Sequence, residues 1–294
     1  MTSRSDRLTL TAFLLVAVLA GGNAVGIRFS NRELDPLWGA GLRFAGAATI
    51  LLVAMAVMRL PFPRNRNLFG ATLYGLLGFA AAFSLAYYGF QELHAGFGQI
   101  LLALVPLLTL LLAVLERQEV FKWAAAGGGI LALAGVAVMS QGALRESIPI
   151  ISLLALVGSA TCFAQAGIVV AWIRDVHPIT MNAVGMAVAA IVLLGASFIA
   201  GETHVMPDLA ETQLALGYLI VIGSVVVFVL NVFVIRQWGP SRASYILVLI
   251  PVFTIAYSVW LLDEPVGWEL IAGGALVLAG VYVGALRHTQ TDLA

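Results

Sequence analysis

The amide side chains of Asn23, Gln165 and Asn231 stand within long apolar stretches of this sequence. An unpaired polar group is costly in apolar surroundings, so each position is a candidate for binding a ligand. An amide can donate to a carboxylate or accept from an ammonium group. It can also hydrogen-bond a neighbouring helix. The sequence leaves both roles open for these amides.

Aromatic side chains form a stripe in the stretch 68–90. Phe79, Phe83, Tyr87 and Phe90 follow one another at steps of four, four and three residues, which places them on one face of a helix. Such a stripe either packs against other helices or lipid, or lines a cavity. In the same way Ser224, Phe228 and Asn231 share a face of the stretch 212–235, where an amide beside a ring suits an amphipathic ligand better than lipid.

Two prolines, Pro106 and Pro251, lie inside apolar stretches, a few residues after Gln99 and Tyr245. A proline within a helix removes one hydrogen bond and frees the carbonyl four residues earlier. That carbonyl could face a cavity, or the kink could act as a pivot. We favour the pivot and predict both prolines as hinges.

Arg43 is the charged residue that lies well inside a predicted helix. Its guanidinium could bind an anionic group of a substrate. Long basic side chains near a helix end more often extend toward the headgroups or pair with backbone carbonyls. We therefore favour a structural anchoring role for Arg43.

Membrane-spanning helices must position these residues. Hydrophobic residues make up 61% and charged residues 10% of the 294 residues, against about 45–50% and about 25% in soluble domains. A helix of roughly 20 apolar residues crosses the hydrocarbon core. The sequence predicts ten of them, over residues 8–27, 37–58, 68–90, 95–115, 122–140, 149–172, 179–200, 212–235, 242–262 and 267–286.

The placement of lysine and arginine orients these helices. Cytoplasmic loops carry an excess of both residues. All of them except Arg28, Arg32, Arg43 and Arg145 fall on the side of the N-terminus. Both termini are therefore predicted to be cytoplasmic. The net charge of zero gives no overall field that would attract nucleic acid.

The two halves of the chain, 1–143 and 144–294, are predicted to be repeats. Residues 105–138 align without gaps with residues 250–283, and the identical pairs include Pro106 with Pro251, Thr109 with Thr254, Glu119 with Glu264, Trp123 with Trp268, and Gly128, Gly129 and Gly135 with Gly273, Gly274 and Gly280. We interpret the glycines as points of close helix approach. Each half has five helices, and because this number is odd the second half enters the membrane from the opposite face and is inverted relative to the first. Inverted repeats are typical of secondary transporters, with the substrate near the membrane midplane.

The chain lacks common catalytic and nucleotide-binding patterns. One cysteine and four scattered histidines offer no metal centre. Gly-x-Ser-x-Gly, His-Glu-x-x-His and Walker A patterns are absent from the sequence. We expect no enzyme activity, no cofactor and no metal. Asp and Glu also avoid the centres of the predicted helices, although proton relays use such groups. This favours a facilitator, or proton coupling only through groups near the surface.

Four motifs carry a resemblance to a known family: GGNAV at 21–25, LRF at 42–44, and PLLT at 106–109 and PVFT at 251–254, each leading to a glutamate and a glycine-rich helix. Over nearly its whole length the chain resembles the ten-helix EamA branch of the drug/metabolite transporter superfamily. The resemblance implies a basket of helices around a central cavity, with the fifth and tenth helices peripheral. It also implies export of small metabolites across a bacterial inner membrane. Aromatic amino-acid exporters are the most similar subgroup, although Ala20 and Phe163 stand where tryptophans are usual.

The fold class we predict is an all-α integral membrane protein of two inverted five-helix repeats. We expect a monomer in the lipid bilayer that exports amino acids, including aromatic ones, by alternating access. Export of drugs or other amphipathic metabolites is the alternative. The predicted substrate-binding residues are Asn23, Phe79, Phe83, Tyr87, Gln99, Phe163, Gln165, Phe228, Asn231 and Tyr245.

Overall fold

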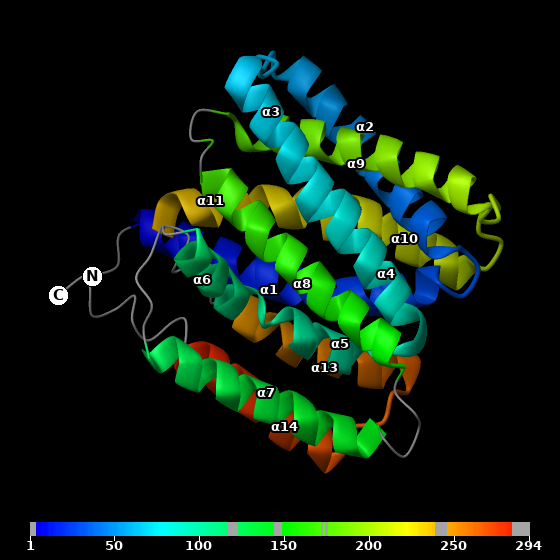
Figure 1. Cartoon of the computed structure of the whole chain (residues 1–294). Coiled ribbons are helices and arrows are strands. Elements are labelled where there is room, and N and C mark those ends of the chain that lie inside the picture. Colours follow the sequence, from blue (N-terminus) through cyan, green and yellow to red (C-terminus); the bar gives the residue numbers. More distant parts are fainter. Residues whose placement is uncertain are drawn as a thin grey trace.

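The computed structural model describes residues 4–116, 123–143, 149–171, 173, 176–238 and 246–283. Over these ranges the chain forms helices and no strands (Figure 1). Two of the segments, η1 and η3, are π-helical. In chain order the segments are α1 (Arg4–Ser30), α2 (Pro36–Val57), α3 (Asn65–Tyr74), η1 (Gly75–Ala81), α4 (Ala82–Glu92), α5 (Ala95–Leu102), α6 (Val105–Leu115), α7 (Trp123–Ala143), α8 (Ile150–Ala171), α9 (Pro178–Ala200), α10 (Ala210–Ile220), η3 (Val221–Val226), α11 (Val227–Trp238), α13 (Ile246–Leu262) and α14 (Trp268–Val281).

Many of these helices are long enough to cross a membrane. A chain in lipid must satisfy its backbone hydrogen bonds internally, and a helix does so within one segment. Among the described residues, seven segments have the necessary length and apolar composition: Arg7–Ser30, Pro36–Val57, Asn65–Glu92, Ala95–Leu112, Ile150–Val170, Pro178–Ala200 and Ala210–Val234. The apolar parts of α13 and α14 are shorter. The chain is an all-helical multi-pass membrane protein, and the number of ten spans stays a prediction.

The fourth predicted span is not one continuous helix. The sequence predicts a helix over 95–115, but α5 ends at Leu102 and α6 begins at Val105. Pro106 lies in the first turn of α6, where its missing N–H leaves no helical hydrogen bond unmade. The matched Pro251 lies inside the continuous helix α13. The two prolines therefore have different local consequences, which the sequence alignment does not reveal.

The helices of the N-terminal and C-terminal parts are interleaved. Helix α1 packs against α10, α11 and α13, and α2 packs along α9. Helices α7 and α14 lie side by side and pack mainly on each other, along one side of the bundle (Figure 1). This arrangement leaves the remaining helices to form the centre of the molecule, where α1, α2, α4, α8 and η3 meet.

Glycine contacts explain the close packing of α7 on α14. A methyl group built on Gly135 would lie 2.6 Å from the carbonyl oxygen of Gly273. One built on Gly280 would lie 2.5 Å from the carbonyl oxygen of Gly128. Each contact is with backbone, which cannot move away as a flexible side chain can. These glycines therefore act as the sequence predicts, since they let two helices touch through their backbones.

Replacing Gly135 with alanine should lower the midpoint of thermal unfolding in detergent. Alanine is favoured over glycine within a helix by about 0.5–1 kcal/mol, but the collision with α14 should cost more, about 1–3 kcal/mol. Gly127→Ala in the same helix is the matched control, because nothing lies within 4 Å of its added methyl group. An equal or higher midpoint for Gly135→Ala than for Gly127→Ala would contradict the close contact.

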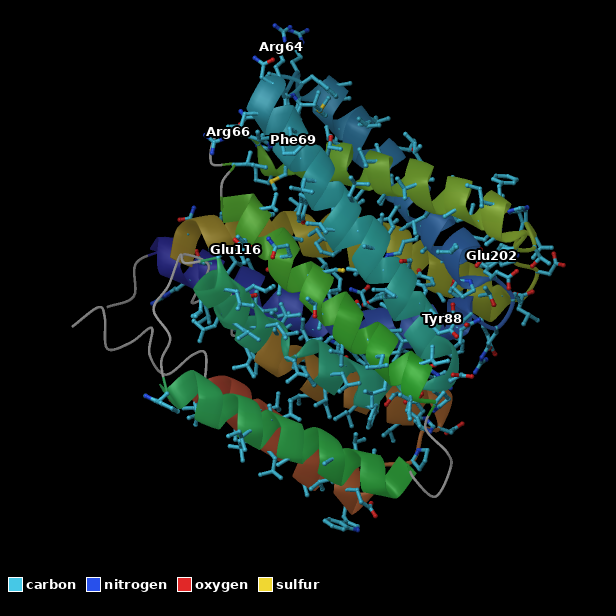
Figure 2. The ribbon with its side chains drawn as sticks, in the orientation of Figure 1. Arg64, Arg66, Phe69, Tyr88, Glu116 and Glu202 are labelled. Atoms are coloured by element: carbon cyan, nitrogen blue, oxygen red, sulfur yellow. The ribbon has the colours of Figure 1, made fainter. Side chains whose placement is uncertain are left out.

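Carboxylates link separate helices at one end of the bundle. Glu202 accepts hydrogen bonds from two backbone N–H groups at the start of α2, and Glu33 accepts from the N–H groups just before α10. The first N–H groups of a helix have no partner within it, and the helix dipole favours negative charge there. Glu202 lies at the end opposite Arg64 and Arg66 (Figure 2). On the predicted orientation, this is the outer end.

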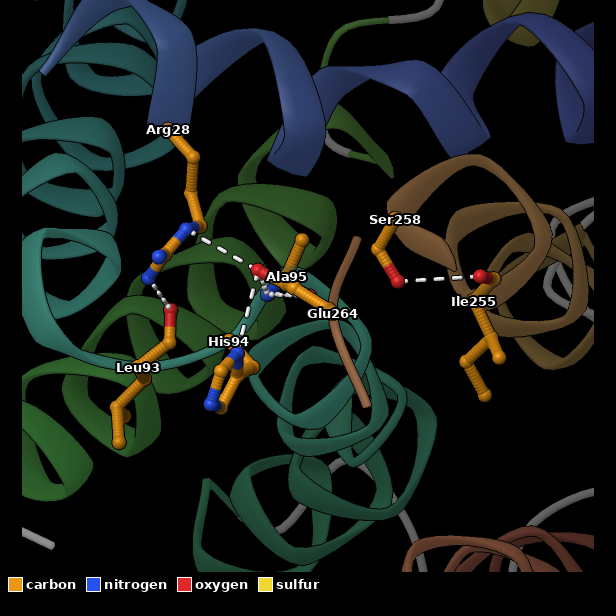
Figure 3. Close-up of polar contacts among 7 residues, drawn as sticks. All are labelled: Arg28, Leu93, His94, Ala95, Ile255, Ser258 and Glu264. Carbon is orange, nitrogen blue, oxygen red and sulfur yellow. Dashed lines mark hydrogen bonds and ion pairs between the residues drawn. The ribbon is translucent and has the colours of Figure 1, made fainter. Parts of the chain in front are cut away.

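Glu264 makes the most extensive of these links (Figure 3). Its carboxylate accepts from the backbone N–H of Ala95 at 2.9 Å, and Arg28 Nε and His94 Nδ1 lie 3.1 Å and 3.4 Å away. Arg28 also donates to the carbonyl oxygen of Leu93 at 2.7 Å. Burial alone would raise the pKa of Glu264, but the contacts with His94, Ala95 and Arg28 outweigh it and lower the pKa below its ordinary value. The cluster joins α1, the start of α5 and the α13–α14 connection.

Glu264→Gln should destabilise the protein in a pH-dependent way. Because the pKa of Glu264 is lower in the folded state, its carboxylate stabilises the fold above the ordinary value of 4.5, and this contribution is lost as pH falls through the folded-state pKa. At pH 7 the loss should be about 1.5–3 kcal/mol. The measurement is the unfolding midpoint from pH 7 to acid pH.

Glu211→Gln is the control for this experiment, since Glu211 forms an exposed ion pair with Arg32 that should contribute at most about 1 kcal/mol. The difference between wild type and Glu264→Gln should shrink toward acid pH. A difference that stays constant with pH, or one no larger than that of Glu211→Gln, would show that the Glu264 carboxylate does not hold this end together.

Candidate functional site

A cluster of aromatic rings occupies the centre of the bundle. The Phe83 ring of α4 lies 5.1 Å from the Phe163 ring of α8 and 6.2 Å from the Phe228 ring of α11, between ring centroids. Phe79 of η1 lies 4.9 Å from Phe228 in an edge-to-face arrangement. Phe44 of α2 contacts both Phe79 and Phe83, at 5.2 Å and 4.9 Å. Five phenylalanines, from α2, the continuous helix η1–α4, α8 and α11, therefore form a single apolar cluster, hereafter the phenylalanine cluster.

Arg43 of α2 lies directly against the phenylalanine cluster and is fully buried. Its guanidinium carbon sits 4.6 Å from the centre of the Phe83 ring and 5.3 Å from that of Phe44. The faces of aromatic rings attract cations. The cluster is therefore apolar on one side and carries a positive charge on the other.

Hydrogen bonds to η3 and α1 fix the guanidinium. Arg43 Nε donates to Ser224 Oγ at 2.8 Å, and Nη2 donates to the carbonyl oxygen of Gly223 at 3.0 Å and to Asn23 Oδ1 at 3.3 Å. Asn23 Nδ2 also reaches the Gly223 carbonyl, at 3.4 Å. A methyl group added at Gly223 would collide with Asn23 Oδ1, so an alanine there would displace the Asn23 amide from Arg43. A buried charge requires this degree of hydrogen bonding.

The GGNAV motif at 21–25 brings α1 to this centre. A methyl group on Gly21 would lie 2.6 Å from Phe253 Cβ of α13, and one on Gly22 would collide with the Tyr218 hydroxyl of α10. Thr254 Oγ1 of α13 donates to the carbonyl oxygen of Gly21 at 2.8 Å. The two glycines therefore allow close approach, and Asn23 one position later reaches η3.

The structure brings together part of the predicted substrate-binding set. Phe79, Phe83, Phe163 and Phe228 form the phenylalanine cluster. Asn23 lies at its edge through Arg43. Tyr87 of α4 is fully buried, and its hydroxyl lies beside Arg43 and Ser30.

The other predicted residues have different surroundings. Gln165 donates to Glu116 Oε1 at the end of α6 at 2.8 Å. Gln99 is buried in α5, and Asn231 is half-buried in α11. Tyr245 lies outside the described residues. Of the hinge prolines, Pro106 starts α6 and Pro251 lies within α13.

Arg43 and Phe44 are the residues of this site that the sequence interpretation missed. Arg43 was expected to anchor a helix end, because it lies less than two turns from the predicted boundary. In the structure Arg43 does pair with a backbone carbonyl, that of Gly223 in η3, but it is completely buried at the centre of the bundle. A charged residue within a membrane helix usually indicates a functional site, and the position of Arg43 within the predicted span 37–58 is such an indication. The sequence did not show that η3 would pass close enough to hold the guanidinium.

An open surface hollow is a separate feature near the predicted cytoplasmic end. It is lined by Pro61, Phe62, Pro63, Arg64, Asn67, Val176 and His177. It contains none of the predicted substrate-binding residues. The convergence of charge, amides and rings favours the centre of the bundle as the candidate site.

Known proteins resemble this chain over most of its length. The EamA-like transporter family matches residues 7–141 and again residues 150–285. An uncharacterized inner membrane transporter of Escherichia coli K12, YedA, is 28% identical over 278 residues, which cover 92% of this chain and 89% of the relative. A probable amino-acid metabolite efflux pump of Salmonella typhimurium is 25% identical, with 92% of each protein covered.

A solved crystal structure also has the same fold. It superposes with a TM-score of 0.68 at 17% sequence identity, and the match covers 99% of this chain and 100% of the other. At this identity the likeness concerns the fold alone. Together with the two family matches, which leave few residues of the chain outside them, these comparisons show that the chain is a member of the EamA-like transporter family.

Proposed function

We propose that this protein exports amino acids, aromatic ones included, by alternating access around the phenylalanine cluster. The observation that carries the proposal is the contact between this cluster and the buried Arg43. An apolar surface beside a few fixed polar groups is typical of sites for small amphipathic molecules. The name of the Salmonella relative, a probable amino-acid metabolite efflux pump, supports the same substrate class.

The architecture we propose for this function is ten spans in two inverted repeats, 1–143 and 144–294. The two successive family matches support it. So do the two π-helical segments, because η1 contains Gly78 and η3 contains Gly223 at corresponding places in the third and eighth predicted spans. The site would then lie between the repeats. We place the protein in a bacterial inner membrane, as the name of the Escherichia coli relative suggests, with both termini cytoplasmic.

Shortening the rings of the cluster should weaken transport of phenylalanine. In proteoliposomes, Phe163→Ala and Phe228→Ala should each raise KM about tenfold, which corresponds to about 1.4 kcal/mol. Both side chains are only partly buried, so the fold should tolerate the change. Phe69→Ala is the control, because its ring is 67% exposed and Figure 2 shows it on the outside of the bundle. Unchanged KM in both cluster variants would contradict the proposed site.

Transport should not be driven by a pH gradient. In the described parts of the predicted spans no aspartate or glutamate is buried among the helices, so a carboxylate proton relay of the usual kind is not available there. Liposomes loaded to equal phenylalanine concentrations on both sides should show exchange of label and no net accumulation when a pH gradient is applied. Net accumulation that collapses when the gradient is dissipated would overturn the facilitator mechanism.

A further inference from the structure

Three buried polar atoms around the Tyr87 hydroxyl have no partner in hydrogen-bond geometry. They are Arg43 Nη1, the Tyr87 hydroxyl and the Ser30 hydroxyl. The Tyr87 hydroxyl lies beside both other side chains, but neither contact has hydrogen-bond geometry. Ser30 and Tyr87 also converge on Gly39, one turn before Arg43 in α2, since a methyl group there would lie 2.9 Å from Ser30 Oγ and 3.4 Å from Tyr87 Cε1. An unsatisfied buried donor is costly, and three at one place require an explanation.

The remaining bonds of Arg43 fix the direction of its free nitrogen. Nε and Nη2 are both engaged by Ser224, Gly223 and Asn23, which hold the plane of the guanidinium. Nη1 is the nitrogen left over. None of the ion pairs found among the described residues includes Arg43. The positive charge at Nη1 therefore lacks a carboxylate partner in the described part of the chain.

The other half of the chain does not repeat this feature. The Asp35–Pro36 and His177–Pro178 turns correspond, so the position in α9 that matches Arg43 is Gly185. There α9 packs directly on η1, and a methyl group on Gly185 would lie 3.4 Å from Gly75 Cα. Arg43 packs on η3 in the same relation. Helix packing at the matched position of α9 is made with a glycine, so the charge of Arg43 has a role beyond its part in holding the helices together.

We propose that Arg43 Nη1 and the hydroxyls of Tyr87 and Ser30 bind the carboxylate of the transported molecule, whose apolar side chain lies on the phenylalanine cluster. This inference rests on the proposed function and narrows it to one substrate class, carboxylates that bear an apolar or aromatic group. Three donors that include a guanidinium match the acceptor oxygens of one carboxylate. An amine without a carboxylate would meet like charge at Arg43.

The geometry also predicts which molecules the site would select. Phe83 lies against the guanidinium at 4.6 Å and touches the rings of Phe163 and Phe228. A carboxylate on Nη1 thus leaves its side chain next to aromatic faces. One guanidinium can neutralise one carboxylate, whereas a diphosphate would need several basic groups. In this state the three atoms are shielded from solvent, so the substrate enters when the surrounding helices separate.

Binding of three related compounds to the purified full-length protein in lipid nanodiscs tests the proposal. The compounds are phenylalanine, 3-phenylpropanoate, which lacks the ammonium group, and 2-phenylethylamine, which lacks the carboxylate. The measurement is the rise in unfolding temperature with ligand concentration, which gives an affinity without any transport step. The first two compounds should stabilise the protein in a saturable way, and the amine should not.

Tyr87→Phe and Ser30→Ala are the decisive variants. Each removes a hydroxyl that has no hydrogen-bond partner, so the unfolding temperature without ligand should stay the same or rise. The affinity for 3-phenylpropanoate should fall about tenfold or more in each. Arg43→Gln should abolish binding. Thr49→Ala is the control in α2, because its exposed hydroxyl bonds only to Ala45 of its own helix, and it should bind as wild type does.

Two results would overturn the carboxylate site: equal stabilisation by 2-phenylethylamine and 3-phenylpropanoate, or wild-type affinity in Tyr87→Phe and Ser30→Ala. Phenylalanine flux in liposomes separates this inference from the proposed function. Flux without selectivity for the carboxylate would reject the carboxylate site and leave the transporter proposal standing. Carboxylate binding that depends on Arg43, without flux of any of the three compounds, would support the site and reject amino-acid export.

Discussion

The burial of one guanidinium governs the centre of this protein. A charge cannot stay within a membrane bundle unless hydrogen bonds and polarisable groups replace its water. Arg43 obtains these from Gly223 and Ser224 of η3, Asn23 of α1 and the face of Phe83. These partners come from both the N-terminal and the C-terminal part of the chain. The same contacts that hold the charge therefore tie the two parts together where a substrate would bind.

The N-terminal ends of helices need negative charge rather than positive charge, because their first N–H groups have no partner within the helix. At the predicted outer end, Glu33, Glu202 and Glu264 each supply it to a helix from a different part of the chain. These links join the start of α2 to the segment after α9, the start of α10 to the segment after α1, and the start of α5 to the segment after α13. Separating the helices at this end would require the carboxylates to leave these N–H groups.

The sequence predicts the helices well wherever apolar length decides the outcome. Membrane helices have few alternatives, and the glycines of α7 and α14 have the packing role expected of them. It does not show that the helix is interrupted just before Pro106, since a proline can either kink a helix or start a new one and its local sequence does not distinguish these. The sequence does not show how deeply Arg43 is buried or which groups it bonds, because both depend on η3, which lies about 180 residues later in the chain. The π-helical segments η1 and η3 are not predicted either, because the third and eighth predicted spans show no pattern that separates them from an ordinary α-helix.

The most direct test of this account is an experimental structure of the protein with bound 3-phenylpropanoate. The account predicts a carboxylate oxygen about 3 Å from Arg43 Nη1, with the phenyl ring among Phe83, Phe163 and Phe228. Arg43 should keep its bonds to η3. A ligand bound elsewhere, for example in the hollow beside His177, or one bound at the phenylalanine cluster with its carboxylate turned away from Arg43, would contradict it.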